Sequence, residues 1–357
     1  MSNRLLVEGL ASSGIKVDLH VFAGGEVAVE PYKNIRRYDH STRPKSVLEH
    51  LACANAITRK AKSLRPDFVL LLDEGMVRAL GFLPFVVRND LRYVSVNSGS
   101  TLTRGDKHFR GRVNAGLVRR GYRWLDRIFV ARSTAAALPE VCPEVAGRVR
   151  LLGRPVPDNF FSRGTEENLL SFSDNALPTL FSCARAEDEK GIGLILCALA
   201  ELRNESGAEV AKFVFAGDGP ALGSWKKMAQ ELGLRHVCFL GRRPIEDLIP
   251  YYRACFMGVF PAHGSIETFG RTWVEAFAFG KPVISTTTDN LKYLVNDGVN
   301  GIAVEPRIES IIGGVRRALS LSKAEYMKMS QNALETARPY SQSAIVKDLL
   351  EMLDELR

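Results

Sequence analysis

Short apolar blocks alternate with longer segments of helical periodicity through the second half of the chain. The blocks predict strands at 179–183, 212–216, 236–240, 255–260, 282–285 and 301–304. The segments between and after them predict helices at 191–203, 221–233, 245–254, 271–279, near 290–296, 308–320, 323–337 and 341–356. Strands that alternate with helices in this way indicate βαβ units and a parallel sheet covered on both faces.

The first half shows a less regular version of the same pattern. It predicts strands at 15–22, 68–72, 92–96, 127–130 and 148–152. It predicts helices at 4–13, 45–64, 75–87 and 113–125, with a further helix that begins at Ser133. Polar sequence fills the interval before the helix at 45–64, and the polar, Gly-rich segment 97–112 is predicted to be a functional loop.

A chain of 357 residues is too long for one small core and favours two domains. We expect an α/β protein with two Rossmann-like domains that face a cleft. The predicted parts are an N-terminal domain, a polar linker, a C-terminal domain and a last helix that packs back on the N-terminal domain, at 1–160, 161–178, 179–338 and 339–357. In such sheets ligands bind at the carboxyl ends of the strands.

The composition is typical of a soluble globular protein, with 46% hydrophobic and 25% charged residues. No apolar run reaches the roughly 18 residues that a membrane span needs, and no signal peptide opens the chain. The six cysteines are scattered without a C-x-x-C pair. We therefore expect reduced thiols in a cytoplasmic protein, and no structural zinc.

The net charge of +8 is concentrated in the first half of the chain. Residues 1–150 carry 25 Lys and Arg against 14 Asp and Glu, a balance of +11, while the remainder carries a balance of −3. A basic first half favours an anionic partner such as a lipid surface, a phosphorylated acceptor or nucleic acid. A dispersed, solvated basic face is the alternative.

The segment 261–285 combines a loop, a helix and a strand, and the other candidate sites are arranged around it. Its helix is apolar nearly all round, which predicts that it is buried. Gly280 and Pro282 end it. A buried carboxylate needs a partner, so we expect one for Glu275 in the middle of this helix.

The start of this helix has the properties of an anion site. Backbone N–H groups at Phe269, Gly270 and Arg271 lie at the positive end of the helix dipole and can hold anionic oxygens. Glu275 can accept hydrogen bonds from neutral hydroxyls such as a ribose diol. Glu267 lies just outside the helix, where it could contact a third group on the same ligand. The alternative is a buried crossover helix that Glu267 caps.

Two cations follow the first strand of the second half. Arg185 and Lys190 are five residues apart in a strand-to-helix loop, so both side chains can reach one anionic group. The alternative is a solvated loop in which the acidic residues of 187–189 neutralise them.

Two further loops follow strands. Gly217 and Asp218 open a G-D-G-P turn that permits close approach of the backbone to a ligand, although most such turns are only turns. Gly241 and Arg242 open a G-R-R-P segment whose backbone, with the Ile245 side chain, can frame a flat base. No Walker loop, metalloprotease motif, G-x-S-x-G elbow or D-x-D metal pair is present in the sequence.

Taken in order, these segments resemble the retaining GT-B glycosyltransferases of glycosyltransferase family 4, also called glycosyl transferases group 1. The resemblance covers about 179–338 and includes Arg185 to Lys190, F-A-G-D-G-P, V-C-F-L-G and E-T-F-G-x-x-x-x-E-A-F-A-x-G-x-P-V-I. The last motif contains the family's pair of glutamates separated by seven residues, here Glu267 and Glu275. Four motifs in one order are more specific than any of them alone.

The resemblance implies transfer of a sugar from a nucleotide-diphosphate sugar, without a metal or other cofactor. Arg185 and Lys190 would neutralise the diphosphate, and Glu275 would hold the ribose hydroxyls. Glu267 and the backbone at 269–270 would contact the sugar and its phosphate. Charge builds on the departing diphosphate in the transition state, so cations and amide dipoles placed there would lower the barrier.

The first domain departs from the family pattern. Members normally begin with a strand and a Gly-rich loop before the helix that residues 4–13 resemble, so we expect an N-terminal domain without its first strand. Asn97 stands where many members carry a histidine in the acceptor loop, and His108 is a possible substitute or merely a solvated loop residue.

The combined expectation is an enzyme of surface-polysaccharide or lipid-linked glycan assembly. Its acceptor would be anionic or lipid-linked, and it would work in the cytoplasm at the inner face of the membrane as a peripheral protein. A noncatalytic nucleotide-sugar-binding or scaffold protein with a truncated N-terminal domain is the alternative. A nucleic-acid partner is not expected, since the basic half lacks an aromatic-interleaved motif.

Overall fold

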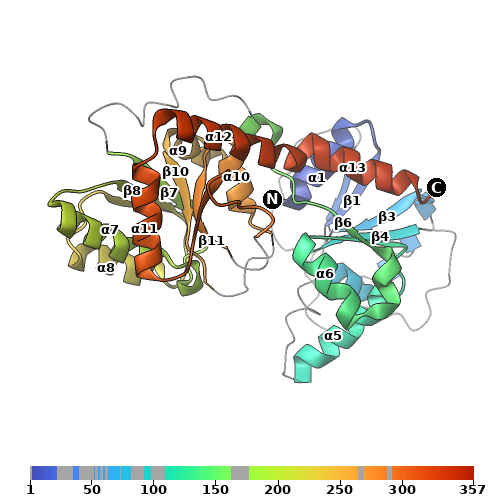
Figure 1. The fold of residues 1–357 in the computed structure, drawn as a ribbon. Coiled ribbons are helices and arrows are strands. Elements are labelled where there is room, and N and C mark those ends of the chain that lie inside the picture. The colour runs from blue at the N-terminus through green and yellow to red at the C-terminus, as the bar shows by residue number, and fades with distance from the viewer. Residues whose placement is uncertain are drawn as a thin grey trace. The chain divides into compact units, whose positions relative to one another are not determined.

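The computed structural model describes residues 2–21, 35–39, 52, 55–56, 59–60, 63–72, 74–81, 92–97, 109–161, 177–263, 269–287 and 292–357. The chain divides into two compact units (Figure 1). The first unit comprises Met1–Pro155 and Ile345–Arg357, and the second comprises Val156–Ala344. The end of the chain therefore belongs to the same unit as its beginning.

The second unit contains a parallel sheet in which six strands are described. Their order is β12-β11-β10-β7-β8-β9. The strands are β7 (Thr179–Cys183), β8 (Lys212–Ala216), β9 (Val237–Gly241), β10 (Met257–Phe260), β11 (Val283–Thr286) and β12 (Gly301–Val304). Chain order reverses between β7 and β10, which makes this pair the topological switch point of a doubly wound sheet.

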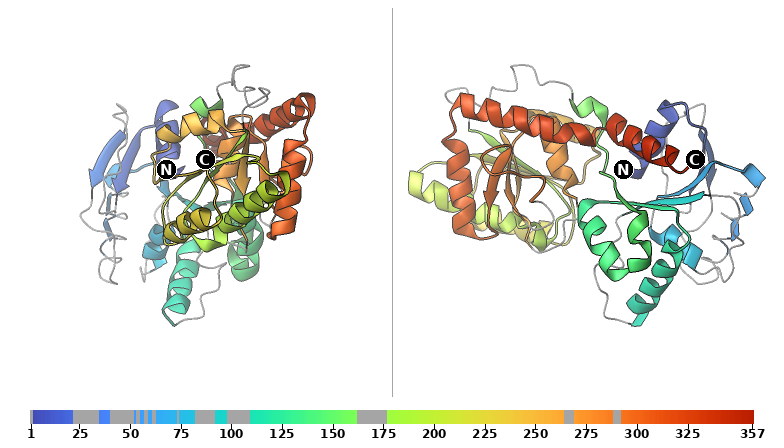
Figure 2. Two further views of the ribbon diagram at one scale, coloured as in Figure 1. Left: turned by 90° about the vertical axis from the view of Figure 1, so that its left-hand side faces the viewer. Right: turned by 45° about the vertical axis from the view of Figure 1, so that its right-hand side comes forward.

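Helices cover both faces of this sheet (Figures 1 and 2). They are α7 (Ile192–Ser206), α8 (Leu222–Glu231), α9 (Ile249–Ala254), α10 (Arg271–Ala278), α11 (Ile308–Leu319) and α12 (Lys323–Ala337). Buried residues of α7, α8 and α11 share one hydrophobic cluster with Leu180, Phe213 and Phe215 of the sheet. Phe181 points to the opposite face, as alternation along a strand requires, and its ring contacts the rings of Tyr251 and Tyr252 on α9.

The first unit contains two parallel sheets within its described residues. One has the order β3-β4-β5-β6, from β3 (Phe68–Leu71), β4 (Arg92–Asn97), β5 (Arg127–Val130) and β6 (Val149–Leu151). The other pairs β1 (Val17–Val21) with β2 (Ile35–Asp39). The helices described beside them are α1 (Ser2–Ser12), α3 (Glu74–Gly81), α5 (Phe109–Tyr122), α6 (Arg132–Val141) and most of α13 (Gln342–Asp354).

Two glycines let α3 and α5 pack backbone against backbone. A Cβ on Gly121 would lie 1.9 Å from the carbonyl oxygen of Val77, and a Cβ on Gly81 would lie 2.0 Å from that of Leu117. No real Cβ can approach an oxygen so closely, so both positions require glycine. The contact holds the two helices against the cluster that includes Val118 and Tyr122.

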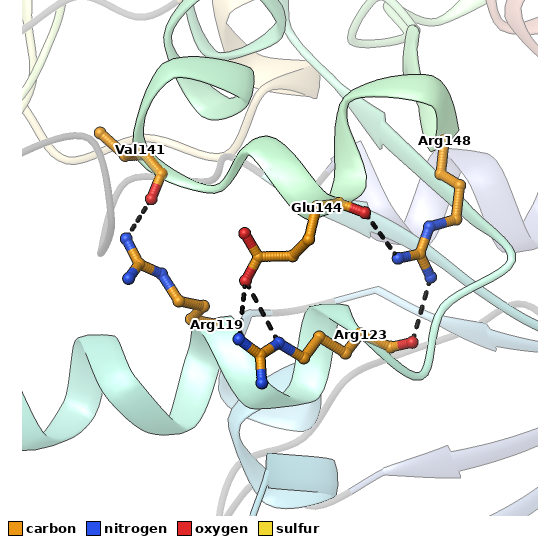
Figure 3. A network of polar contacts seen from close by, with 5 residues as sticks. All are labelled: Arg119, Arg123, Val141, Glu144 and Arg148. Atoms are coloured by element: carbon orange, nitrogen blue, oxygen red, sulfur yellow. Dashed lines mark hydrogen bonds and ion pairs between the residues drawn. The ribbon is translucent and has the colours of Figure 1, made fainter.

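Several arginines of the first unit stabilise its own loops (Figure 3). Arg123 forms an ion pair with Glu144 at 3.1 Å. Arg148 donates to the carbonyl oxygens of Arg123, Leu125 and Glu144 at 2.8–3.0 Å. Arg119 donates to the carbonyl oxygen of Val141. Part of the positive charge in this half therefore serves local structure.

The predicted α/β architecture with two parallel-sheet domains is confirmed. The expected strands all appear within two residues of their predicted bounds, and those at 127–130, 179–183, 212–216 and 301–304 match fully. Most of the predicted linker, 162–176, and much of the predicted helix at 45–64 lie outside the described residues.

Four local predictions were wrong. The strand β2 was not expected, because its sequence I-R-R-Y-D lacks an apolar alternation. The helix α5 begins at Phe109, inside the predicted loop, because its first turn has the polar and glycine residues of a loop. The helix expected at 245–254 begins with a 3-10 turn at Glu246–Leu248. The described part of the helix expected near 290–296 is a turn at 292–294 followed by irregular chain.

Candidate functional site

A small pocket lies at the carboxyl ends of β7 and β10, where the order of the second sheet reverses. It is lined by Ser182, Ala184, Lys190, Phe260, Ala262, Thr272 and Trp273. These residues come from the ends of the two strands, from the loops after β7 and β10, and from the first turn of α10. The pocket therefore occupies the position where doubly wound sheets bind their ligands.

The first turn of α10 brings helix N–H groups to this pocket. The N-cap residue is Gly270, which has a left-handed conformation (φ +73°). As a glycine it has no side chain that could cap the helix. The first N–H groups of an α-helix have no acceptor within the helix and lie at the positive end of its dipole. Thr272 and Trp273 line the pocket in this turn. The Trp273 N–H donates to the carbonyl oxygen of Gly270 at 3.1 Å, so anion binding by this turn would depend on the N–H groups that precede Trp273.

A chain of hydrogen bonds connects Trp273 and Ala262 of the pocket wall. Trp273 Nε1 donates to Ser285 Oγ at 2.6 Å, and Ser285 Oγ donates to the carbonyl oxygen of Thr286 at 3.0 Å. Thr286 Oγ1 in turn donates to the carbonyl oxygen of Ala262. The ends of β10 and β11 are thereby tied to α10 through buried polar groups.

The two cations of the β7 loop lie in different surroundings. Lys190 is half-buried and lines the pocket together with the first turn of α10. Arg185 is exposed, and its Nη1 forms an ion pair with Glu187 Oε1 at 2.6 Å. The structure thus brings Lys190 to the helix N-terminus and gives Arg185 a local acidic partner.

Glycines allow the loops around the pocket to pack closely. Gly217 and Gly219 have φ values of +152° and +154°, and a Cβ on either would collide with the carbonyl oxygens of Ala184 and Ala186 at 1.8 and 2.5 Å. The carbonyl oxygen of Asp218 accepts a hydrogen bond from Ala186 N at 2.9 Å. The G-D-G-P turn therefore supports the β7 loop, which accounts for its glycines without a ligand.

Glu275 is buried in the second unit with two partners, as its sequence position required. Its side chain is 1% exposed. Oε2 accepts a hydrogen bond from the Tyr252 phenol at 2.8 Å, and Oε1 forms an ion pair with Arg271 Nε at 2.9 Å. Burial raises the pKa of the Glu275 carboxyl above its usual value, although the Arg271 charge and the Tyr252 hydrogen bond oppose this.

Cys183, at the end of β7, is the third titratable group near this carboxylate. The pKa of its thiol is raised to about 12, mainly by burial and then by the Glu275 charge, while Arg271 opposes both. The thiol is therefore neutral at physiological pH. Glu275 thus sits among one cation and two neutral hydrogen-bonding groups.

The remaining predicted donor-site residues lie elsewhere around the same sheet. Gly241 ends β9, and its carbonyl oxygen accepts a hydrogen bond from Gly217 N at 2.9 Å. Arg242 is exposed and Ile245 is buried. Phe269 is buried, its carbonyl oxygen accepts from the Tyr293 phenol at 3.2 Å, and its ring meets that of Tyr340 edge-on.

Three predicted site positions cannot be placed with their side chains. Glu267, the first glutamate of the signature, and His108 lie outside the described residues. Asn97 is the last residue of β4, where its backbone pairs with Val130, and its side chain lies outside the description.

Sequence reasoning missed Tyr252 and most of the pocket wall. Tyr252 lies on the short helix α9, which has Pro250 in its first turn, and neither its spacing nor its type pointed to Glu275. Ser182 and Thr272 are small polar residues next to buried apolar ones, which is a weak signal. The one indication of Tyr252 was indirect: a buried Glu275 requires a hydrogen-bonding partner, and Tyr252 is that partner.

Within the part of the chain that the structure describes, no group of three or more His, Cys, Asp or Glu side chains has an arrangement that could hold a metal ion.

Among the described helices, none combines the length and apolar character needed to cross a bilayer.

The comparison with known families concerns the second unit. Residues 171–336 match the family Glycosyl transferases group 1. The matched region includes the six described strands of the second sheet, Lys190, α10 and Glu275. The similarity to this family thus lies within the second unit.

Individual relatives match over the same half of the chain. The D-inositol 3-phosphate glycosyltransferase of Corynebacterium efficiens is 28% identical over 176 residues, which cover 48% of this chain and 41% of that protein. The alpha-monoglucosyldiacylglycerol synthase of Streptococcus pneumoniae is 36% identical over 124 residues, which cover 34% of this chain and 27% of that protein. The chain thus spans less than half the length of these curated relatives.

A comparison of folds extends over both units. HepE of Anabaena, solved in complex with UDP, has a TM-score of 0.79 and 16% sequence identity, with 99% of this chain and 96% of that chain covered. At this identity the likeness concerns the fold, which is the GT-B architecture of two parallel-sheet domains.

Proposed function

We propose that this protein is a glycosyltransferase that moves a sugar from a nucleotide-diphosphate sugar to an acceptor. The observation that carries the proposal is that Lys190 and the first turn of α10 line one pocket at the switch point of the sheet. An ammonium group and a helix N-terminus that lie at one pocket are suited to a diphosphate. The family match of residues 171–336 and the UDP bound to HepE support the same ligand class.

Each part of the donor is assigned to residues of the second unit. Lys190 and the α10 N-terminus hold the diphosphate and stabilise the charge that develops on it as the sugar departs. Arg185 joins them when the diphosphate competes with Glu187 for its guanidinium. Glu275 accepts the ribose hydroxyls, and the segment from Gly241 to Ile245 frames the base.

The reaction is proposed to retain the anomeric configuration and to need no metal, as in glycosyltransferase family 4. Glu267 and the backbone of Phe269 and Gly270 contact the transferred sugar and its phosphate. The motif in which Glu267 and Glu275 are separated by seven residues supports this assignment, as does the lack of a D-x-D pair in the sequence.

The acceptor is proposed to be anionic or lipid-linked, in surface-polysaccharide or lipid-linked glycan assembly. The balance of +11 in residues 1–150 supports an anionic acceptor and peripheral contact with the inner face of a membrane. The names of the two relatives, which refer to an inositol phosphate and a diacylglycerol, support the same classes. Asn97 and His108 are the proposed acceptor-side residues.

The test measures release of nucleoside diphosphate from UDP-, GDP- and ADP-sugars in the presence of phosphorylated and lipid-linked acceptors. Acceptor-dependent release from at least one donor supports the proposal, and proton NMR of the product then reads the anomeric configuration. Donor binding without any release would favour a noncatalytic nucleotide-sugar-binding protein. Absence of donor binding would overturn the proposal.

A further inference from the structure

The helix α9 carries a tyrosine whose phenol reaches the carboxylate assigned to the ribose. Tyr252 is fully buried, and its hydroxyl donates to Glu275 Oε2 at 2.8 Å. Its ring stacks on Phe279, with centroids 5.5 Å apart and planes 9° apart, and meets the edge of Phe181 at 4.9 Å. The phenol oxygen is therefore held in place by rings on both sides.

We infer that Tyr252 is a positioning residue that orients the Glu275 carboxylate for the ribose hydroxyls of the donor. This inference rests on the proposed function. Tyr252 acts through Glu275 and does not itself contact the ligand.

The contacts of the carboxylate show how the orientation arises. An ionised carboxylate has about four acceptor sites on its two oxygens. Tyr252 occupies one on Oε2, and Arg271 lies 2.9 Å from Oε1. Within the described residues Oε1 has no hydrogen bond of good geometry, although this atom is buried. The phenol thus fixes one oxygen while the other keeps acceptor capacity for a hydroxyl.

The charges around Glu275 explain why a hydrogen-bond donor is needed there. Arg271 faces it from its own helix, Tyr252 from α9, and Cys183 from β7. Burial raises the pKa of the Glu275 carboxyl, and the Tyr252 hydrogen bond is one of the contacts that lower it. Without the phenol hydroxyl this pKa rises further. The ionised acceptor is then lost at a higher pH than in the unmodified protein.

The test compares Tyr252→Phe with Tyr251→Phe. Tyr251 is the neighbouring residue on α9, and its ring stacks on Phe181. The phenol that donates to Glu275 is that of Tyr252. Binding of UDP, GDP and ADP, and of their 2′,3′-dideoxy analogues, is measured by calorimetry between pH 5 and pH 9. Urea unfolding curves verify that each variant is folded.

We expect Tyr252→Phe to bind the ribonucleotide about tenfold more weakly than Tyr251→Phe, the scale of a hydrogen bond to a charged group. Binding of the dideoxy analogue should be equal in the two variants. Ribonucleotide affinity should fall as the pH is lowered, and this fall, the acidic limb of the binding curve, should lie at higher pH in Tyr252→Phe. In a Glu275→Gln background the same substitution should cause no further loss, because the two residues act as one unit.

Two results would overturn the inference while leaving the proposed function intact. One is equal ribonucleotide affinity in Tyr252→Phe and Tyr251→Phe. The other is an equal loss for ribonucleotide and dideoxy analogue, which would assign Tyr252 a purely structural role. Failure of the unmodified protein to bind any of the three nucleoside diphosphates would instead overturn the proposed function.

A second variant covers the case in which Tyr252→Phe does not fold. Incorporation of 3-fluorotyrosine at position 252 keeps the ring and makes the phenol a stronger hydrogen-bond donor. The acidic limb of ribonucleotide binding should then move to lower pH. An unchanged limb would contradict the inference.

Discussion

Gly191 lies so close to Pro261 that a Cβ on Gly191 would be 2.2 Å from the carbonyl oxygen of Pro261. The two residues belong to the loops that follow β7 and β10, the strands between which the pocket opens. The nearby hydrogen bond from His263 N to the carbonyl oxygen of Glu189, at 2.9 Å, ties the same loops together. The shape of the pocket therefore depends on close contact between these two backbones.

This contact predicts that Gly191→Ala is strongly destabilising. Gly191 has φ +70°, so alanine costs about 1 kcal/mol or more in backbone strain, and the collision with Pro261 adds roughly 1–3 kcal/mol. Gly207 is the matched control, since it ends the same helix at φ +72° with no atom within 4 Å of a Cβ. Urea unfolding should show a larger decrease in the free energy of unfolding for Gly191→Ala than for Gly207→Ala. Equal decreases would mean that the close contact with Pro261 does not contribute to the cost of the substitution.

The different surroundings of the two β7-loop cations predict unequal effects on turnover. Lys190→Ala should slow release of nucleoside diphosphate by roughly a hundredfold, the scale of a donor placed at developing charge. Arg185→Ala should have a smaller effect, because its guanidinium already forms an ion pair with Glu187. The double variant should show the slowest release of nucleoside diphosphate. Lys212→Ala is the control, since Lys212 is exposed at the start of β8, at the opposite end of the sheet. Near-normal rates in Lys190→Ala would contradict the assignment.

The buried carboxylate predicts a pH-dependent gain in stability for Glu275→Gln. The folded pKa of Glu275 is raised above its ordinary value, so between the two values the folded state binds more protons than the unfolded state. The free energy of unfolding therefore falls as pH rises through this range. A glutamine side chain cannot titrate, so the variant should lack this fall. Unfolding curves from pH 4 to pH 8 should show the stability difference increasing in favour of the variant, and a decrease would contradict the raised pKa.

The contact between α3 and α5 predicts opposite effects for two glycines of one helix. Gly121→Ala should cost several kcal/mol, since its Cβ would lie 1.9 Å from the Val77 carbonyl oxygen. Gly116 has no atom within 4 Å of a Cβ, and alanine there should stabilise the helix by about 0.5–1 kcal/mol. Thermal unfolding of the two variants measures both changes. Similar midpoints would argue against the close packing of these helices.

The sequence predicted the second unit better than the first for a physical reason. Strands buried on both faces are continuous apolar blocks, and β7, β8 and β12 appear at their predicted bounds. The strand β2 contains two adjacent arginines and a tyrosine, so its pairing with β1 depends on tertiary context that no local pattern carries. The first turn of α5 was taken for loop because glycine and arginine are common in both.

For the site, the sequence indicated the helix, its glutamate and the lysine but not their neighbours. Burial of α10 followed from its apolar circumference, and a partner for Glu275 followed from the cost of an unpaired buried charge. The identity of that partner depended on how α9 packs beside α10, which sequence spacing does not encode. The role of Gly217 as a support for the β7 loop likewise became evident only from the contact with Ala184.

The central claim is that Lys190 and the first turn of α10 bind a diphosphate. Calorimetric titration with UDP, GDP and ADP and with the matching monophosphates tests it most directly. The account predicts that at least one diphosphate binds tenfold or more tightly than its monophosphate, and that Lys190→Ala abolishes this difference. Equal affinities of diphosphate and monophosphate in the unmodified protein would contradict it.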